Sequence, residues 1–133
     1  MLALSGWSLF AKESEDKVSG VIKTVTGKNP ADIKQDARVS LNVPTIAESG
    51  ANVPVKITVN IPVKDVKSVH VFVDNNPTPH IMGINFSEMS GEAYLEARVR
   101  FAKSSAIRGV AILNDGSAIM DQKEVKVTVG GCG

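Results

Sequence analysis

Residues 53–61 read VPVKITVNI, and an apolar side chain occupies every second position of this stretch. The apolar positions are Val53, Val55, Ile57, Val59 and Ile61. Because successive side chains of a β-strand point to opposite faces, this alternation predicts a half-buried strand with one face in a hydrophobic core. The fold class depends on how often the pattern recurs along the chain.

The same strand pattern is found on both sides of this stretch. Residues 37–43 alternate in the same way and stop at Pro44. The other strand-like segments are 68–74, 80–86, 92–101, 106–113 and 118–129. Between the last two, residues 114–117 read NDGS, and Asp-Gly between apolar runs indicates a β-hairpin. Residues 45–52 are expected to form a loop. Seven short strands without crossover helices predict an antiparallel β-sandwich.

One segment ahead of the strands has helical spacing instead. Its apolar residues recur at i, i+3, i+4 and i+7, which places them on one face of an amphipathic helix. These residues are Val18, Val21, Ile22 and Val25. Ser14 is suited to cap the start of the helix and Gly27 to end it. We therefore expect a mainly β domain over residues 14–129, with one N-terminal α-helix.

The composition agrees with one domain of this size. The chain has 133 residues, of which 43% are hydrophobic and 5% aromatic, so Val, Ile, Ala and Leu must form most of the core. Fifteen basic side chains oppose fourteen acidic ones, and no block of like charge stands out. The charge pattern therefore favours neither a nucleic acid nor a membrane as a partner.

The first residues, MLALSGWSLFA, are apolar and uncharged until Lys12. This run is too short to span a bilayer. Two interpretations of residues 1–13 stay open, namely the remnant of a signal peptide and a loosely ordered N-terminus.

Metal and cofactor sites are not predicted. The two histidines, His70 and His80, have no cysteine nearby and are interpreted as ordinary strand and loop residues. Acidic, basic and hydroxyl side chains are scattered along the strands without a recognisable catalytic arrangement.

The unusual feature is the chain's only cysteine, Cys132, which Gly130, Gly131 and Gly133 surround. A catalytic thiol needs a partner that lowers its pKa and a frame that fixes it, whereas glycine leaves the backbone least constrained. The neighbouring C-terminal carboxylate also disfavours the thiolate. A thiol with minimal bulk around it suits a swinging carrier arm instead. Three residues beyond Val129, it reaches about 10 Å from the last strand.

The sequence bears on two other uses of this thiol. Prenylation is excluded because its motif places the cysteine fourth from the end. An intermolecular disulfide between two Cys132 side chains stays open, since an exposed unpaired thiol pairs readily in an oxidising compartment. The chain would then be a β-sandwich interaction module that forms a homodimer.

The end of the chain, KEVKVTVGGCG over residues 123–133, resembles the C-terminus of the SoxY family, the sulfur carriers of the Sox thiosulfate-oxidising system. The resemblance covers most of the chain from Ser14 onward. The segments that carry it are SEDKVSGVIKTVTG (14–27), VSLNVPTIAESGANVPVKITVNIP (39–62), VDNNPTP (73–79) and ARVRFAKSS (97–105). The family tail commonly reads GGCGG, whereas this sequence ends at Gly133.

This resemblance implies an immunoglobulin-like sandwich with a flexible C-terminal tail over residues 130–133. It implies that Cys132 covalently holds the sulfur substrate while separate enzymes oxidise and hydrolyse it. It also implies a periplasmic location and a heterodimer with SoxZ, a second small β-sandwich. On this interpretation the chain is a non-enzymatic carrier, and Gly130, Gly131 and Gly133 give the arm its freedom.

Overall fold

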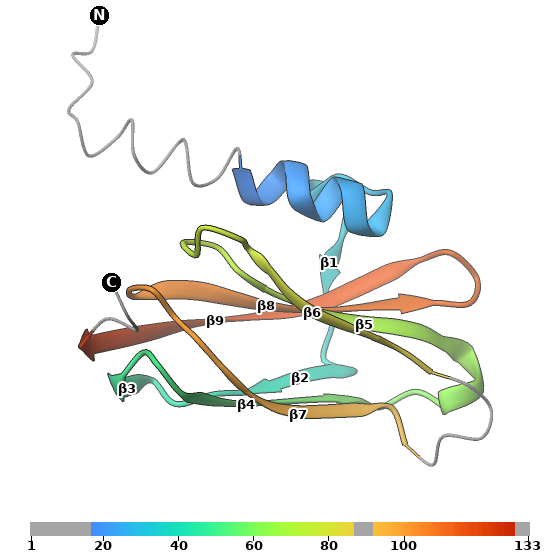
Figure 1. The fold of residues 1–133 in the computed structure, drawn as a ribbon. Helices are drawn as coiled ribbons and strands as arrows, with labels where there is room; N and C mark the ends of the chain where they lie inside the picture. Colours follow the sequence, from blue (N-terminus) through green and yellow to red (C-terminus); the bar gives the residue numbers. More distant parts are fainter. Residues whose placement is uncertain (1–16, 87–91, 130–133) are drawn as a thin grey trace, which may run out of the picture.

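The structure, a computed structural model, describes residues 17–86 and 92–129. Two β-sheets pack face to face, and a helix lies across the outer face of the larger sheet (Figure 1). The predicted fold class is confirmed: a mainly β, immunoglobulin-like sandwich with one N-terminal helix. Residues 1–13 and the predicted tail, residues 130–133, lie outside the described residues.

The larger sheet has the order β1-β9-β8-β5-β6, and β3 also pairs with β9. Its strands are β1 (Lys34–Gln35), β3 (Ile46–Ser49), β5 (Val66–Val73), β6 (His80–Asn85), β8 (Ser105–Leu113) and β9 (Ala118–Val129). The smaller sheet has the order β2-β4-β7, with β2 (Val39–Asn42), β4 (Val53–Val59) and β7 (Tyr94–Val99). Two short 3₁₀ helices, η1 (Pro30–Asp32) and η2 (Val63–Asp65), complete the described elements. All seven predicted strands are present, and neighbours among them pair antiparallel.

Two short strands were not predicted. β1 and β3 both pair parallel with β9, so the expected loop at residues 45–52 was wrong over Ile46–Ser49. Only Ala47 of β3 is buried, and the segment has no alternating apolar pattern. β3 is a strand because its backbone pairs with Lys126–Val129, about eighty residues further along the chain. No local pattern reports such a pairing.

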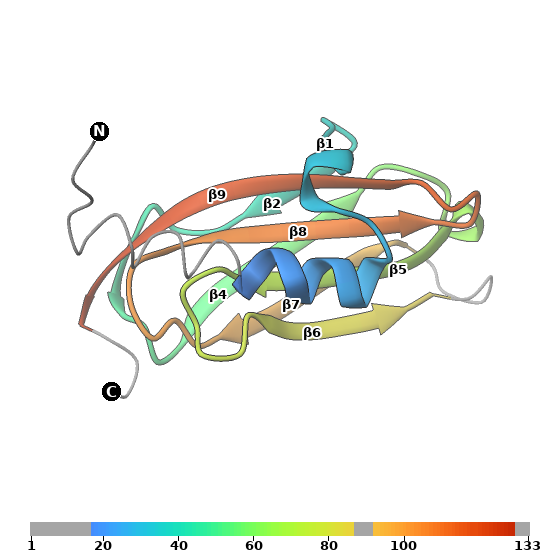
Figure 2. The same ribbon diagram turned by 90° about the horizontal axis from the view of Figure 1, so that it is seen from above.

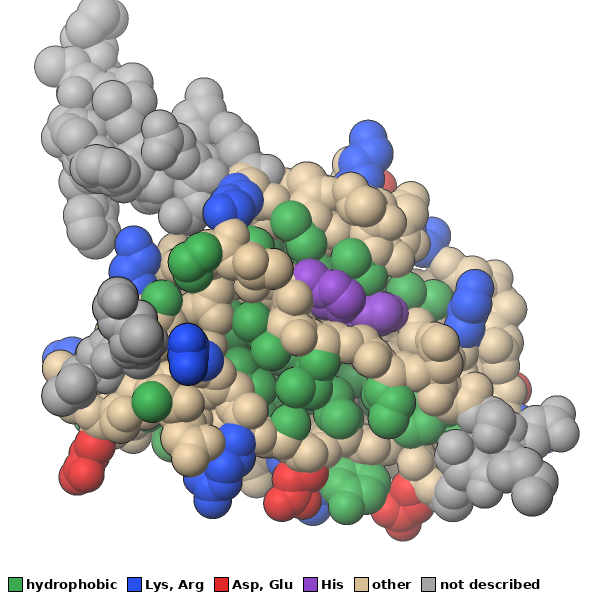
Figure 3. All heavy atoms as spheres, viewed as in Figure 1, with side chains coloured by type: hydrophobic (Ala, Val, Ile, Leu, Met, Phe, Trp, Pro, Cys, Tyr) green, Lys and Arg blue, Asp and Glu red, His purple; other side chains and the backbone are tan. Residues whose placement is uncertain are grey.

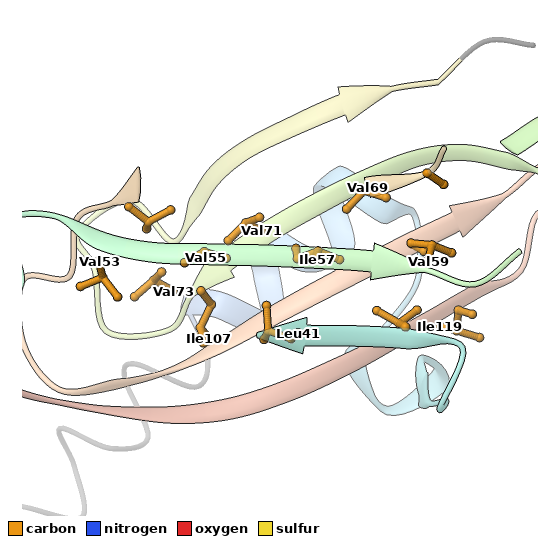
Figure 4. Close-up of a cluster of buried hydrophobic side chains, with 14 of the residues drawn as sticks. Leu41, Val53, Val55, Ile57, Val59, Val69, Val71, Val73, Ile107 and Ile119 are labelled. Carbon is orange, nitrogen blue, oxygen red and sulfur yellow. The ribbon is translucent and has the colours of Figure 1, made fainter. Parts of the chain in front are cut away.

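The core between the sheets is built on β4, whose inward side chains are each at most 4% exposed: Val53, Val55, Ile57 and Val59. Figure 4 shows them gathered with Val69 and Val71 of β5 and with Ile107 of β8 in the layer between the sheets. Burying one such side chain contributes about 1.5–3 kcal/mol to folding. The apolar positions in the alternating pattern of residues 53–59 are therefore the side chains that form this layer.

A second apolar layer lies under the helix, which covers residues 17–26 of the described chain (Figure 2). Val18 and Ile22 are at most 1% exposed and pack in one cluster with Phe72 of β5 and Val110 of β8. The helix ends where expected, because Gly27 adopts a φ of 76° and donates its N–H to the carbonyl of Lys23 at 2.8 Å. The helix therefore covers part of the outer face of the larger sheet, and the main core covers its inner face.

Candidate functional site

The predicted attachment residue, Cys132, and its neighbours Gly130, Gly131 and Gly133 lie outside the described residues. The described chain ends at Val129, three residues before the thiol. The structure therefore describes the point from which the predicted arm starts. We call Lys126–Val129, the last four residues of β9, the arm base.

On one side, β3 holds the arm base by parallel pairing. Ile46 is opposite Lys126, and Ser49 is opposite Val129. The N–H of Lys126 donates to the carbonyl of Thr45 at 2.9 Å. A side-chain bond adds to this ladder, because the hydroxyl of Thr128 donates to the carbonyl of Glu48 at 2.9 Å. The pairing continues to the last described residue of β9.

On the other side, the arm base is held by strand β8 and then by the side chain of Ser104. The β8–β9 ladder ends with Ser105 opposite Val125. Beyond it, the N–H of Val127 donates to Oγ of Ser104 at 2.8 Å, and this hydroxyl is also 3.4 Å from the carbonyl oxygen of Val127. The side chain of Ser104, the residue before β8, thus satisfies the backbone beyond the last β8–β9 pair, so both sides of the arm base have hydrogen-bond partners.

The loop between β5 and β6 fixes Ser104 in turn. Asn75 donates its side-chain amide to the carbonyl of Ser104 at 2.9 Å and its N–H to Oγ of Ser105 at 3.0 Å. Asn76, only 7% exposed, donates to the carbonyl of Arg100 at 2.7 Å and accepts from the N–H of Ala102 at 2.9 Å. Two adjacent asparagines therefore hold the connection from β7 to β8, which explains why a polar Asn76 is buried here.

An ion pair fastens the same loop to β8. Arg108 donates from Nε to Oδ1 of Asp74 at 3.0 Å and from Nη2 to Oδ2 at 2.9 Å. The two side chains are only 15% and 14% exposed. A two-point arginine–carboxylate contact of this kind fixes geometry as well as contributing energy.

Three of the segments that resemble SoxY thus meet at one end of the sandwich. Residues 45–49 supply β3, residues 73–79 supply the asparagine loop, and residues 97–105 supply Ser104. Figure 1 shows these segments at the same end of the molecule as the tip of β9. Nothing in their separate sequences predicts that they surround the arm base. The Asn-Asn pair was the available signal, since asparagine often bonds to neighbouring backbone in turns.

The fold also brings the two histidines together, which the sequence did not predict. His70 lies in β5 and His80 begins β6, so His80 is a strand residue and not a loop residue. Nδ1 of His70 is 3.1 Å from Nε2 of His80. Burial lowers the pKa of His70, and the neighbouring His80 adds to this effect. Ten residues apart, the rings meet only through the β5–β6 pairing.

Two further findings concern residues 17–86 and 92–129. These ranges contain no group of three or more His, Cys, Asp or Glu side chains that could hold a metal ion. No helix there is both long and apolar enough to cross a membrane.

The fold and the arm base define a class: a small β-sandwich protein whose single cysteine follows an anchored last strand. A family model described as "Sulfur oxidation protein SoxY" matches residues 22–132, a range that includes Cys132. The chain belongs to the SoxY family. None of the curated proteins matches its sequence.

Several solved structures are similar to this chain. The sulfur carrier protein SoxY from Chlorobium limicola f thiosulfatophilum is similar with a TM-score of 0.72 and 27% identity, over 86% of this chain and 99% of that one. Superoxide reductases are also similar. A putative one from Thermotoga maritima has a TM-score of 0.61 and 14% identity, over 75% of this chain and 97% of its own. Neelaredoxin from Ignicoccus hospitalis has a TM-score of 0.59 and 13% identity, over 67% and 79%. At such identities the likeness shows the fold alone.

Proposed function

We propose that this protein carries thiosulfate-derived sulfur intermediates as covalent adducts of Cys132 and presents them to separate Sox enzymes. The main support is the position of the chain's only thiol, three residues after a strand end that is anchored on both sides. Membership of the SoxY family supports the same function. The protein itself contributes position, and the enzymes it visits contribute the chemistry.

An anchored base and a short glycine segment suit this task for a physical reason. A thiol that must enter another protein's active site loses conformational freedom on entry, and each backbone residue that becomes ordered costs about 1–2 kcal/mol. Holding the chain rigid up to Val129 limits this cost to the residues beyond it. The about 10 Å reach of three extended residues is still enough to place the thiol inside a narrow channel.

Joining the thiolate of Cys132 to thiosulfate forms a sulfur–sulfur bond and releases two electrons to an oxidising partner enzyme. Hydrolysis of the resulting adduct by another enzyme consumes one water, releases sulfate and two protons, and leaves a persulfide on the arm. The proposed setting is the periplasm, with a SoxZ-like subunit as the heterodimer partner.

The test replaces the thiol. In a reconstituted Sox system, Cys132→Ser is expected to abolish thiosulfate-dependent turnover, because a hydroxyl cannot form the sulfur–sulfur bond. Its thermal unfolding midpoint should match that of the parent protein. Intact mass of the parent protein taken directly from cells should show sulfur-containing adducts that the variant lacks. Normal turnover by Cys132→Ser would contradict the proposal.

A second candidate function rests on the same thiol. An unpaired cysteine near the chain end is suited to a Cys132–Cys132 disulfide, which would make the chain a covalently dimerising interaction module. Non-reducing electrophoresis and light scattering in reductant separate the two functions. A doubled mass in protein taken from cells, without sulfur adducts, favours the disulfide module. A dimer band that persists in Cys132→Ala under non-reducing denaturing conditions contradicts it.

A further inference from the structure

We propose that His70 and His80 form a binding site for a divalent transition-metal ion, on the outer face of the larger sheet. The site goes beyond the proposed function, because it does not involve Cys132. The two facing nitrogens, Nδ1 of His70 and Nε2 of His80, are 3.1 Å apart. With metal–nitrogen bonds of 2.0–2.1 Å, this separation corresponds to an angle of about 100° at the ion. That angle lies between the octahedral and tetrahedral values.

The two rings come from paired strands, so their positions are set by a sheet and not by a loop. His70 is opposite Gly83 in the β5–β6 register, and Phe72 is opposite His80, with a register shift between them. The ring centroids of the two histidines are 5.2 Å apart. A Cβ at Gly83 would collide with Nδ1 and Cε1 of His70. The missing side chain at Gly83 therefore makes the space in which the His70 ring faces His80.

A further side chain orients His70 as a ligand. The remaining ring nitrogen of His70, Nε2, is 3.0 Å from Oγ of Ser68, which is only 3% exposed. When Nε2 carries the proton, its N–H donates a hydrogen bond to Oγ of Ser68, and the lone pair of Nδ1 is free for a metal. Metal-bound histidines are commonly oriented by such a bond from the other ring nitrogen.

The site is open to solvent and its chemistry is selective. Both histidines are partly exposed, and Figure 3 shows them at the surface beside apolar side chains. Water completes the coordination, because no third His, Cys, Asp or Glu of the described ranges groups with the pair. Imidazole nitrogens suit Cu²⁺, Ni²⁺ and Zn²⁺, whereas Mg²⁺ and Ca²⁺ require oxygen ligands. We expect Cu²⁺ to bind tighter than Ni²⁺ or Zn²⁺, and Mg²⁺ not to bind.

The experiment uses the full chain with Cys132→Ser, so that the thiol neither binds nor reduces the metal. Calorimetric titration with CuCl₂, ZnCl₂ and MgCl₂ at pH 7.5 should give one Cu²⁺ per chain, weaker Zn²⁺ binding and no Mg²⁺ binding. Electron paramagnetic resonance of the Cu²⁺ complex should show two imidazole nitrogens. Adding His80→Gln should lower the Cu²⁺ affinity by more than about tenfold, since loss of even an orienting partner costs 10–100-fold.

Two more variants distinguish the site from surface binding. Ser68→Ala should weaken Cu²⁺ binding while preserving the two-nitrogen spectrum, and Ser117→Ala, in the β8–β9 turn, should change neither. Circular dichroism and unfolding in chelator verify that each variant is folded. The proposal is overturned if the parent binds no Cu²⁺, or if both His70→Gln and His80→Gln bind it as tightly as the parent does.

Discussion

The hydroxyl oxygen of Ser104 lies 2.8 Å from the backbone nitrogen of Val127, beyond the last backbone pairing of β8 with β9. Ser104 immediately precedes β8, and its side chain continues the hydrogen bonding to β9 beyond the last β8–β9 backbone pair. Together with β3 on the opposite side, it fixes the direction in which β9 leaves the sandwich. The proposed carrier arm consequently starts from a held point.

We predict that Ser104→Ala loosens the arm base without unfolding the domain. Losing this bond should lower the free energy of unfolding by about 1 kcal/mol. Hydrogen exchange at the Val127 amide should accelerate. In a reconstituted system the carrier's KM should rise by about fivefold, because an additional residue must be ordered on entry at a cost of about 1 kcal/mol.

Ser117→Ala is the matched control, because the hydroxyl of Ser117 bonds to Asp115 in the β8–β9 turn and makes no bond to the arm base. This control should leave the KM unchanged, and Ser104→Thr should restore it by keeping the hydroxyl. Equal KM values for Ser104→Ala and the parent protein would show that the anchoring does not affect transfer.

A second prediction concerns the glycines of the arm. Replacing Gly130 and Gly131 together with Val adds β-branched bulk and restricts the backbone beside the thiol. Turnover by the partner enzymes should fall sharply, while labelling of Cys132 by a small thiol reagent should change little. The unfolding midpoint should also hold, since the described core ends with β9. Wild-type turnover in this double variant would argue against insertion of the arm into a narrow channel.

The third prediction compares two ion pairs. Arg108→Ala removes the partner of Asp74, whose side chain is 14% exposed, and should lower the free energy of unfolding by about 1–3 kcal/mol. Arg38→Ala breaks a contact of similar length with Asp36, but Arg38 is 53% exposed. Solvent screens that pair, so the unfolding midpoint should hardly move. Urea denaturation of both variants makes the comparison, and equal losses of stability would contradict it.

The fourth prediction concerns pH. Burial lowers the pKa of His70 in the folded protein below its ordinary value of 6.5. Below about pH 6.5, the unfolded chain therefore binds a proton at His70 more readily than the folded protein does. Stability from this residue is complete above pH 6.5 and declines as the pH falls toward the folded pKa, by at most about 1.4 kcal/mol per pH unit. Metal-free unfolding midpoints at pH 7.5 and 5.5 should differ less in His70→Gln than in the parent. An identical difference in both proteins would remove His70 as the cause.

Much of the fold was determined by the sequence through local patterns. The alternation at Val53–Val59 predicted β4 and its buried face, and the helical spacing of Val18 and Ile22 predicted the face that packs on the sheet. Gly27 ended the helix as expected. These predictions succeeded because the period of a hydrophobic pattern, 2.0 or 3.6, is set by the local backbone conformation. The position of Cys132 after a glycine pair likewise required no structure to be noticed.

Tertiary structure alone decided which distant segments meet. β3 has no alternating pattern, and it is a strand because Lys126–Val129 lies beside it. Ser104 reaches Val127, and His70 reaches His80, only through the strand order and register of the larger sheet. Register depends on how two complete faces pack, and slipping by one residue would turn every side chain to the other face. That information is spread over the whole core, so no short stretch of the sequence contains it.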